Sequence, residues 1–179
     1  MYKGSKNILL IIVIIITSSF FQLQKSEVEE YSAKAAFIYN FTKFVEWEKQ
    51  EDGSSSFVIG VVGESSIYKP LQGLALSKKI NNRKIEIVRF NSAAEVTACQ
   101  ILFVPETSSS KNLKECINSK YTKNTLIITE KQGCLEYGSG INFMVIDNRI
   151  KFEINLGSLS KANLKASSQL LKLAQNVQE

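Results

Sequence analysis

The hydrophobic pattern of the chain is strongest between Tyr31 and Trp47, where aromatic residues are densest. This segment contains no Gly or Pro, and its apolar side chains fall on one broad arc when plotted at about 100° per residue. The pattern predicts a helix that is nearly surrounded by protein. Because burying one Phe side chain contributes roughly 1.5–3 kcal/mol, we expect this helix to be a dominant part of the core.

Further along, short β-rich apolar runs alternate with segments of helical spacing. The runs predict buried strands at Phe57–Val62, Cys99–Val104 and Thr125–Thr129, and a strand nearer an edge at Lys84–Phe90. The helical segments are Ser65–Leu76, Ser92–Ala98 and Ser108–Ser119. Residues 48–56 and 130–139 are polar or rich in Gly and small residues, so they predict irregular connections.

The C-terminal third carries two further patterns. Ile141–Ile146 and Ile150–Ile154 flank a short polar turn and predict a β-hairpin. The spacing of the apolar residues in Ser158–Gln175 predicts one amphipathic helix. Together the patterns favour an α/β fold with a mostly parallel sheet, helices on both faces, a C-terminal antiparallel hairpin and a final helix.

The N-terminus has the pattern of a secretory signal peptide. Lys3 and Lys6 precede the uninterrupted aliphatic run Ile8–Ile16, which small residues follow. We therefore predict a signal peptide over residues 1–23, an exported protein, and a single domain over residues 24–179. Phe20 and Phe21 interrupt the small-residue pattern, so the cleavage site is not defined and an uncleaved N-terminal anchor is the alternative.

Composition narrows the function classes. The net charge is +5, but the lysines are scattered and form no basic run with interleaved aromatics, which argues against nucleic-acid binding. The chain has no His, the commonest metal ligand and proton shuttle. A hydrolase triad with His is excluded, and we expect no metal and no cofactor. The lack of His argues against an enzyme but does not exclude chemistry by carboxylates.

Export would place Cys99, Cys116 and Cys134 in an oxidising compartment. Their spacings match no zinc or redox motif, and an odd count leaves at least one thiol unpaired within a monomer. In the predicted fold the 108–119 helix returns Cys116 toward Cys99, so a bridge between these two is geometrically reasonable. It would stabilise the fold by roughly 3 kcal/mol in the chain-entropy model, and Cys134 would be free, buried or an intermolecular bridge.

One charged residue, Lys34, falls inside the apolar arc of the predicted aromatic helix. In one interpretation it pairs with Glu30 four residues earlier and extends to solvent. In the other it reaches into a cleft and meets an anion or the carboxylate of a partner. The sequence does not decide between them.

The hairpin carries the main candidate for a binding surface. Arg149, Lys151, Glu153 and Asn155 alternate along one strand and therefore point to the same face. They could bind an anionic ligand or a partner, or form the solvated face of an edge strand. A second candidate, Val62–Ser65, lies at the carboxyl end of a predicted central strand, where open α/β sheets bind ligands, but it has no phosphate-binding motif.

Several segments appear in an order that resembles a known family. They are Lys34–Trp47, Phe57–Glu64, Ala98–Pro105, Gly138–Asn155 and Ser167–Ala174. Together they resemble the YfiR/HmsC-like family of exported bacterial proteins, most specifically in the aromatic helix ending in Trp and in the strand RIKFEIN. The chain departs from the family in having Glu48 where Pro is usual, and Ser139 where the first Gly of a pair is usual.

The resemblance implies a periplasmic α/β domain, commonly a dimer, without catalytic activity. Family members repress a membrane-bound diguanylate cyclase by binding its periplasmic sensor part, which lowers cyclic di-GMP and biofilm formation. Cysteine redox state and small ligands can modulate such proteins. On this basis the chain would be a non-enzymatic repressor of a membrane sensor.

Two other functions remain as alternatives. One is a periplasmic binding protein for a small anionic or aromatic solute that uses Lys34, Arg149 and Lys151. The other, an enzyme with a carboxylate or a thiol near Cys134 as its reactive group, has little support.

Overall fold

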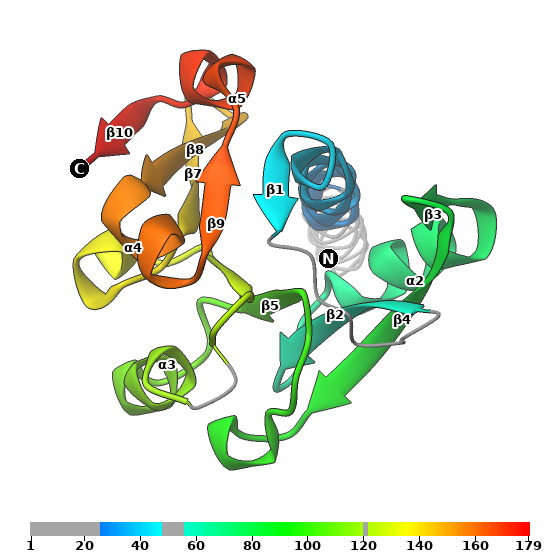
Figure 1. Ribbon diagram of the computed structural model, residues 1–179. Helices are drawn as coiled ribbons and strands as arrows, with labels where there is room; N and C mark the ends of the chain where they lie inside the picture. The colour runs from blue at the N-terminus through cyan, green and yellow to red at the C-terminus, as the bar shows by residue number, and fades with distance from the viewer. Residues whose placement is uncertain (1–25, 48–55, 120–121) are drawn as a thin grey trace, which may run out of the picture.

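The computed structural model describes residues 26–47, 56–119 and 122–179 (Figure 1). The predicted signal peptide, residues 1–23, and nearly all of the predicted loop at 48–56 lie outside these ranges. Within them, no helix is both long enough and apolar enough to cross a membrane.

The aromatic segment forms the predicted helix, but the helix ends earlier than the sequence pattern indicates. It runs over residues 26–41 of the described chain and is followed by a turn and the strand β1 (Val45–Trp47). The Thr42 hydroxyl donates to the Tyr39 carbonyl (2.6 Å), and the next backbone N–H groups bond three residues back, which tightens the last turn. Val45 then becomes extended and pairs with Ala166.

An eight-stranded sheet forms the centre of the molecule, in the order β10-β8-β7-β6-β5-β2-β4-β3. Its members are β2 (Ser56–Val62), β3 (Lys79–Ile80), β4 (Arg83–Phe90), β5 (Ile101–Val104), β6 (Leu126–Thr129), β7 (Ile141–Ile146), β8 (Arg149–Asn155) and β10 (Asn176–Gln178). Strands β4, β2, β5, β6 and β7 pair in parallel, and β8 returns antiparallel to β7. This confirms the predicted fold class.

Helices cover both faces of this sheet. The N-terminal helix and α2 (Tyr68–Ser77) contribute Ile38, Phe41 and Leu71 to one core cluster. Helix α3 (Ser110–Ile117) contributes Leu113 and Cys116 to a second cluster on the opposite face. In Figure 1 the N-terminal helix (blue) lies between α2 and the two-stranded sheet of β1 and β9.

Phe41 is the centre of the larger core. Its ring stacks on Phe143 of β7 at a centroid distance of 5.7 Å and meets the ring of Phe152 of β8 edge-on at 5.0 Å. At the other end of the helix segment, the Trp47 indole N–H donates to the Gln100 carbonyl (3.2 Å). The aromatic segment is therefore fixed to both halves of the sheet.

The predicted hairpin is confirmed as β7 and β8. Asp147 and Asn148 form its turn with φ values of 50° and 56°, the left-handed conformation that a two-residue hairpin turn requires and that Asn and Asp tolerate. A second, unpredicted hairpin joins β3 and β4 through Asn81 and Asn82, at φ values of 48° and 67°. Strand β4 is therefore close to an edge, as its alternating pattern indicated.

The prediction of one C-terminal helix over Ser158–Gln175 is wrong. The segment divides into α4 (Leu156–Lys161), β9 (Leu164–Ala166), α5 (Ser168–Leu173) and β10. Asn163 takes a left-handed conformation (φ 57°) just after α4, and β9 then pairs with β1. The hydroxyl of Ser167 accepts the Leu170 N–H (3.3 Å) and begins α5.

The predicted helix over Ser92–Ala98 is also shorter than expected. Only a 3₁₀ turn, η1 (Ala93–Glu95), forms there. The predicted irregular connection 130–139 contains a second 3₁₀ turn, η2 (Cys134–Tyr137), which lies between Gly133 and Gly138. Both glycines have positive φ values, 80° and 105°, which side chains with a Cβ rarely adopt.

Candidate functional site

The hairpin face predicted from the sequence forms a continuous surface at the free end of β7 and β8. Arg149 lies opposite Ile146, and Lys151 lies opposite Met144. We call these four residues the hairpin surface. Arg149 is exposed and the Ile146 side chain is 39% exposed. Within the described chain, neither Arg149 nor Lys151 forms an ion pair.

Glu153 shares this face but is engaged in a chain of polar groups that leads inward. Its Oε1 accepts from Asn142 Nδ2 (3.0 Å), and Asn142 Oδ1 accepts from the Thr129 hydroxyl (2.7 Å). The Ser139 hydroxyl lies 2.9 Å from that of Thr129 and donates to the Ile141 carbonyl (2.8 Å). Ser139 is fully buried and hydrogen-bonded.

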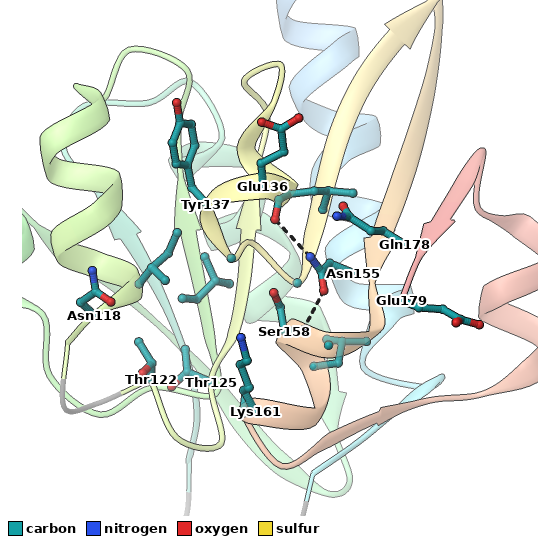
Figure 2. Close-up of a pocket in the computed structure, with 18 residues that line it drawn as sticks. Asn118, Thr122, Thr125, Glu136, Tyr137, Asn155, Ser158, Lys161, Gln178 and Glu179 are labelled. Atoms are coloured by element: carbon teal, nitrogen blue, oxygen red, sulfur yellow. Dashed lines mark hydrogen bonds between the residues drawn. The ribbon is translucent and has the colours of Figure 1, made fainter.

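The Asn155 side chain is buried and connects two segments of the chain. Its side-chain N–H donates to the Leu135 carbonyl (3.1 Å), and its side-chain oxygen accepts the Ser158 N–H (2.8 Å) and caps α4. Figure 2 shows both bonds at the wall of a cleft of about 450 Å³. Asn155 therefore joins η2 to α4, and the structure does not place it on the hairpin surface.

Lys34 is separate from the hairpin surface, because the N-terminal helix packs on the face of β8 that carries Phe152. Its amine binds Glu30 (2.6 Å), as one interpretation expected, and also Glu130 (2.7 Å), which follows β6. The Lys34 and Glu130 side chains are only 5% and 3% exposed, so the expectation that Lys34 extends to solvent is wrong. The carboxylate that Lys34 meets thus belongs to its own chain.

Glu130 is the centre of a hydrogen-bond network that sequence analysis did not identify. It accepts the Tyr31 hydroxyl (3.1 Å) and the backbone N–H of Glu106 (3.1 Å) in addition to Lys34. Burial by itself would lower the pKa of Lys34, but hydrogen bonds and the charges of Glu130 and Glu30 outweigh it, so that the pKa is raised. Burial and the Glu130 charge likewise raise the pKa of Tyr31.

The three cysteines are free, buried thiols in this structure, so it does not contain the bridge expected between Cys99 and Cys116. Cys116 lies on α3 and Cys99 lies just before β5, and both belong to the same apolar cluster. Burial raises their pKa values to about 12 and about 11. Cys134 lies beside Thr129, and burial raises its pKa although hydrogen bonds with Thr129 and Lys131 partly oppose the effect.

No group of His, Cys, Asp and Glu that could hold a metal ion occurs among the residues that the structure describes. The hairpin surface presents two cations beside an apolar side chain, and the buried groups behind it fix the strand that carries them.

Breaking the buried Lys34–Glu130 pair should cost far more stability than breaking an ion pair at the surface. We expect Lys34→Met to lower the free energy of unfolding by about 3–5 kcal/mol, because Glu130 is left charged and buried. Combining it with Glu130→Gln should recover part of that loss. The matched control is Lys111→Met, whose surface partner Glu115 lies 3.9 Å away, and it should change stability by about 0.5 kcal/mol or less.

Urea unfolding of the wild type, Lys34→Met, Glu130→Gln, the double variant and Lys111→Met measures these differences. A Lys34→Met loss no larger than that of the surface control would contradict the account, as would a double variant in which the two single losses simply add.

Comparison with solved structures places the fold among known ones. The chain is similar to a conserved domain protein from Vibrio cholerae O1 biovar El Tor, at 11% sequence identity and a TM-score of 0.56. The likeness covers 83% of this chain and 60% of that chain, and at this identity it shows a shared fold alone. No curated protein matches the sequence.

Comparison with family models identifies the family. The model described as YfiR/HmsC-like matches residues 31–175, from the aromatic helix to the end of α5. The match therefore includes the hairpin and the Lys34–Glu130 pair. Because it spans most of the chain, this protein belongs to the YfiR/HmsC-like family.

Proposed function

We propose that this protein is an exported, non-enzymatic regulator that binds the periplasmic part of a membrane-bound diguanylate cyclase and holds it inactive. Release of the enzyme would raise cyclic di-GMP and promote biofilm formation. Family membership over residues 31–175 supports the general role. The signal peptide at residues 1–23 and a homodimer, both expected from the sequence, are parts of the same proposal.

The hairpin surface is the observation that carries the proposal. Arg149 and Lys151 have no anionic partner within the described chain, and exposed Ile146 lies beside Arg149. Arg and apolar side chains together are typical of protein interfaces. Unpaired cations speed the encounter with an acidic partner and disfavour partners of the wrong charge. On the opposite face of β8, the buried Phe152 packs against Phe41, which anchors the strand that carries this surface.

For such binding to repress an enzyme, the regulator must bind the inactive form of the sensor more tightly than the active form. The shift in the sensor's equilibrium cannot exceed this difference in affinity. The hairpin surface would supply contacts that exist only in the inactive complex, and a change in either partner that weakens them would release the enzyme.

The alternative of a small anionic or aromatic solute bound by Lys34, Arg149 and Lys151 has weaker support. Lys34 is buried in pairs with Glu30 and Glu130, and it lies on a helix that packs against the other face of β8. Only Arg149 and Lys151 remain together as candidate contacts for such a solute.

The regulatory role is tested by reversing the charges of the hairpin surface in the native host. Deleting the gene should raise cellular cyclic di-GMP, and the wild-type protein should restore the low level. We expect Arg149→Glu/Lys151→Glu to leave the level high, because two reversed charges should weaken binding at least about tenfold.

The matched control reverses two exposed cations elsewhere, Lys165 and Lys172, on β9 and α5. This control should repress as the wild type does, with equal amounts of exported protein in every strain. Full repression by the hairpin variant would rule out the hairpin surface as the site that binds the sensor. An unchanged cyclic di-GMP level after deletion of the gene would rule out the regulatory role.

We further propose that Cys99 and Cys116 form a disulfide in the exported protein. Each thiol would lose its proton, and the two electrons would pass to the thiol oxidants of the exported compartment. Since burial raises both pKa values, few thiolates are present in the folded protein at neutral pH. The bridge would therefore form during folding, before α3 covers the sheet.

Peptide mapping of the exported protein without reductant tests this pairing. We expect a linked Cys99–Cys116 peptide, a free Cys134, and a loss of roughly 3 kcal/mol in unfolding free energy after reduction. A bridge that includes Cys134, or three free thiols, would contradict the proposal.

A further inference from the structure

The strand order creates a crevice away from the hairpin surface. From β2 the chain passes through α2 to β4 on one side, and it then returns to form β5 on the other side of β2. Helices α2 and α3 consequently cover opposite faces. At such a switch point the connections leave the carboxyl ends of neighbouring strands in opposite directions, and open α/β sheets bind ligands there.

A cleft of about 770 Å³ occupies this place, a volume within the range of small-molecule sites. Tyr31 comes to it from the N-terminal helix, Tyr68 and Pro70 from α2, Pro105 from the end of β5, and Arg89 from β4. Aromatic and apolar side chains therefore line the cleft beside a guanidinium group, together with polar and charged side chains.

We propose that this cleft binds a small organic acid, with its carboxylate on Arg89 and its apolar body against Tyr31 and Tyr68. The proposal is independent of the regulatory function, because it needs no protein partner. It also concerns other residues than the hairpin surface.

Arg89 is positioned for this role, and its present ion pair is with an exposed carboxylate. Its guanidinium lies over the Tyr68 ring, 4.5 Å from the centroid, and its Nη1 pairs with Glu64 Oε1 at 2.6 Å. The Glu64 side chain is 85% exposed, so this pair is one that solvent screens strongly. A ligand carboxylate can replace that of Glu64 and bind the guanidinium through two hydrogen bonds.

The walls of the cleft are held by the protein itself. The Tyr31 hydroxyl donates to Glu130, whose position Lys34 fixes. At the mouth, the Ser66 hydroxyl donates to Glu27 (2.6 Å), which joins the loop before α2 to the N-terminal helix. Binding would therefore require movement of the Glu64 side chain while the aromatic walls stay in place, which keeps the cost of ordering small.

Charge selects the ligand class. Arg89 and Lys69 line the cleft together with Glu27 and Glu64, so its cations and carboxylates are balanced. Two carboxylates at the rim repel a ligand with several negative charges, such as a polyphosphate. A single carboxylate on an apolar body fits both the one guanidinium and the aromatic walls.

Calorimetric titration of the mature protein with hexanoate and benzoate tests the proposal, with hexanamide and benzamide as uncharged controls. We expect at least one acid to bind and its amide to bind at least about tenfold more weakly. Arg89→Gln should weaken binding of the acid about tenfold or more. Glu64→Gln should strengthen it, because the competing carboxylate is gone.

Arg149→Gln on the hairpin surface is the matched control and should leave the affinity unchanged. Each of the following results would overturn the proposal: neither acid binds, acids and amides bind equally, or Arg149→Gln abolishes binding while Arg89→Gln does not. The Glu64→Gln variant adds a gain of affinity, which a general loss of folding cannot produce.

Discussion

The packing of the aromatic helix across the sheet is the constraint on which the rest of the structure depends. Phe41 contacts Phe143 and Phe152, which lie more than a hundred residues further along the chain. Since side chains alternate along a strand, burying Phe152 against this helix turns Arg149 and Lys151 to the other face of β8. The orientation of the proposed regulatory surface is thus a consequence of how the core is packed.

The same helix carries the largest polar exception in that core. Lys34 and Glu130 are buried together, and Tyr31 completes their network. Breaking such a pair is costly, although forming it contributes little net stability. Its structural effect is to fix the N-terminal helix relative to the carboxyl ends of β5 and β6, and so to position Tyr31 in the wall of the cleft that Arg89 also lines.

The sequence predicted those elements whose signals are local. The hairpin was found because strand alternation and the Asp147–Asn148 turn lie within one short segment. The prediction of one C-terminal helix was wrong because β9 pairs with β1, which lies far away in the chain, and this pairing overrides the helical spacing. Helix 26–41 ends early for the same reason, since Val45 is needed for that pairing.

The candidate sites likewise divide into features with a local sequence signal and features that depend on residues far apart in the chain. Alternation correctly placed Arg149, Lys151 and Glu153 on one face, but it gave no sign that Asn155 caps α4. Glu130 lies 96 positions from Lys34, so no local pattern could connect them. The one available signal was a Lys within an apolar arc, which indicated a partner without identifying it.

The most direct test of the account is photocrosslinking from the hairpin surface in native membranes. A photoreactive amino acid placed at Arg149 should capture one membrane protein that carries a diguanylate cyclase domain, whereas the same group placed at exposed Lys172 should not. Capture of no such enzyme from Arg149, or equal capture from both positions, would contradict the claim that this surface holds a membrane sensor inactive.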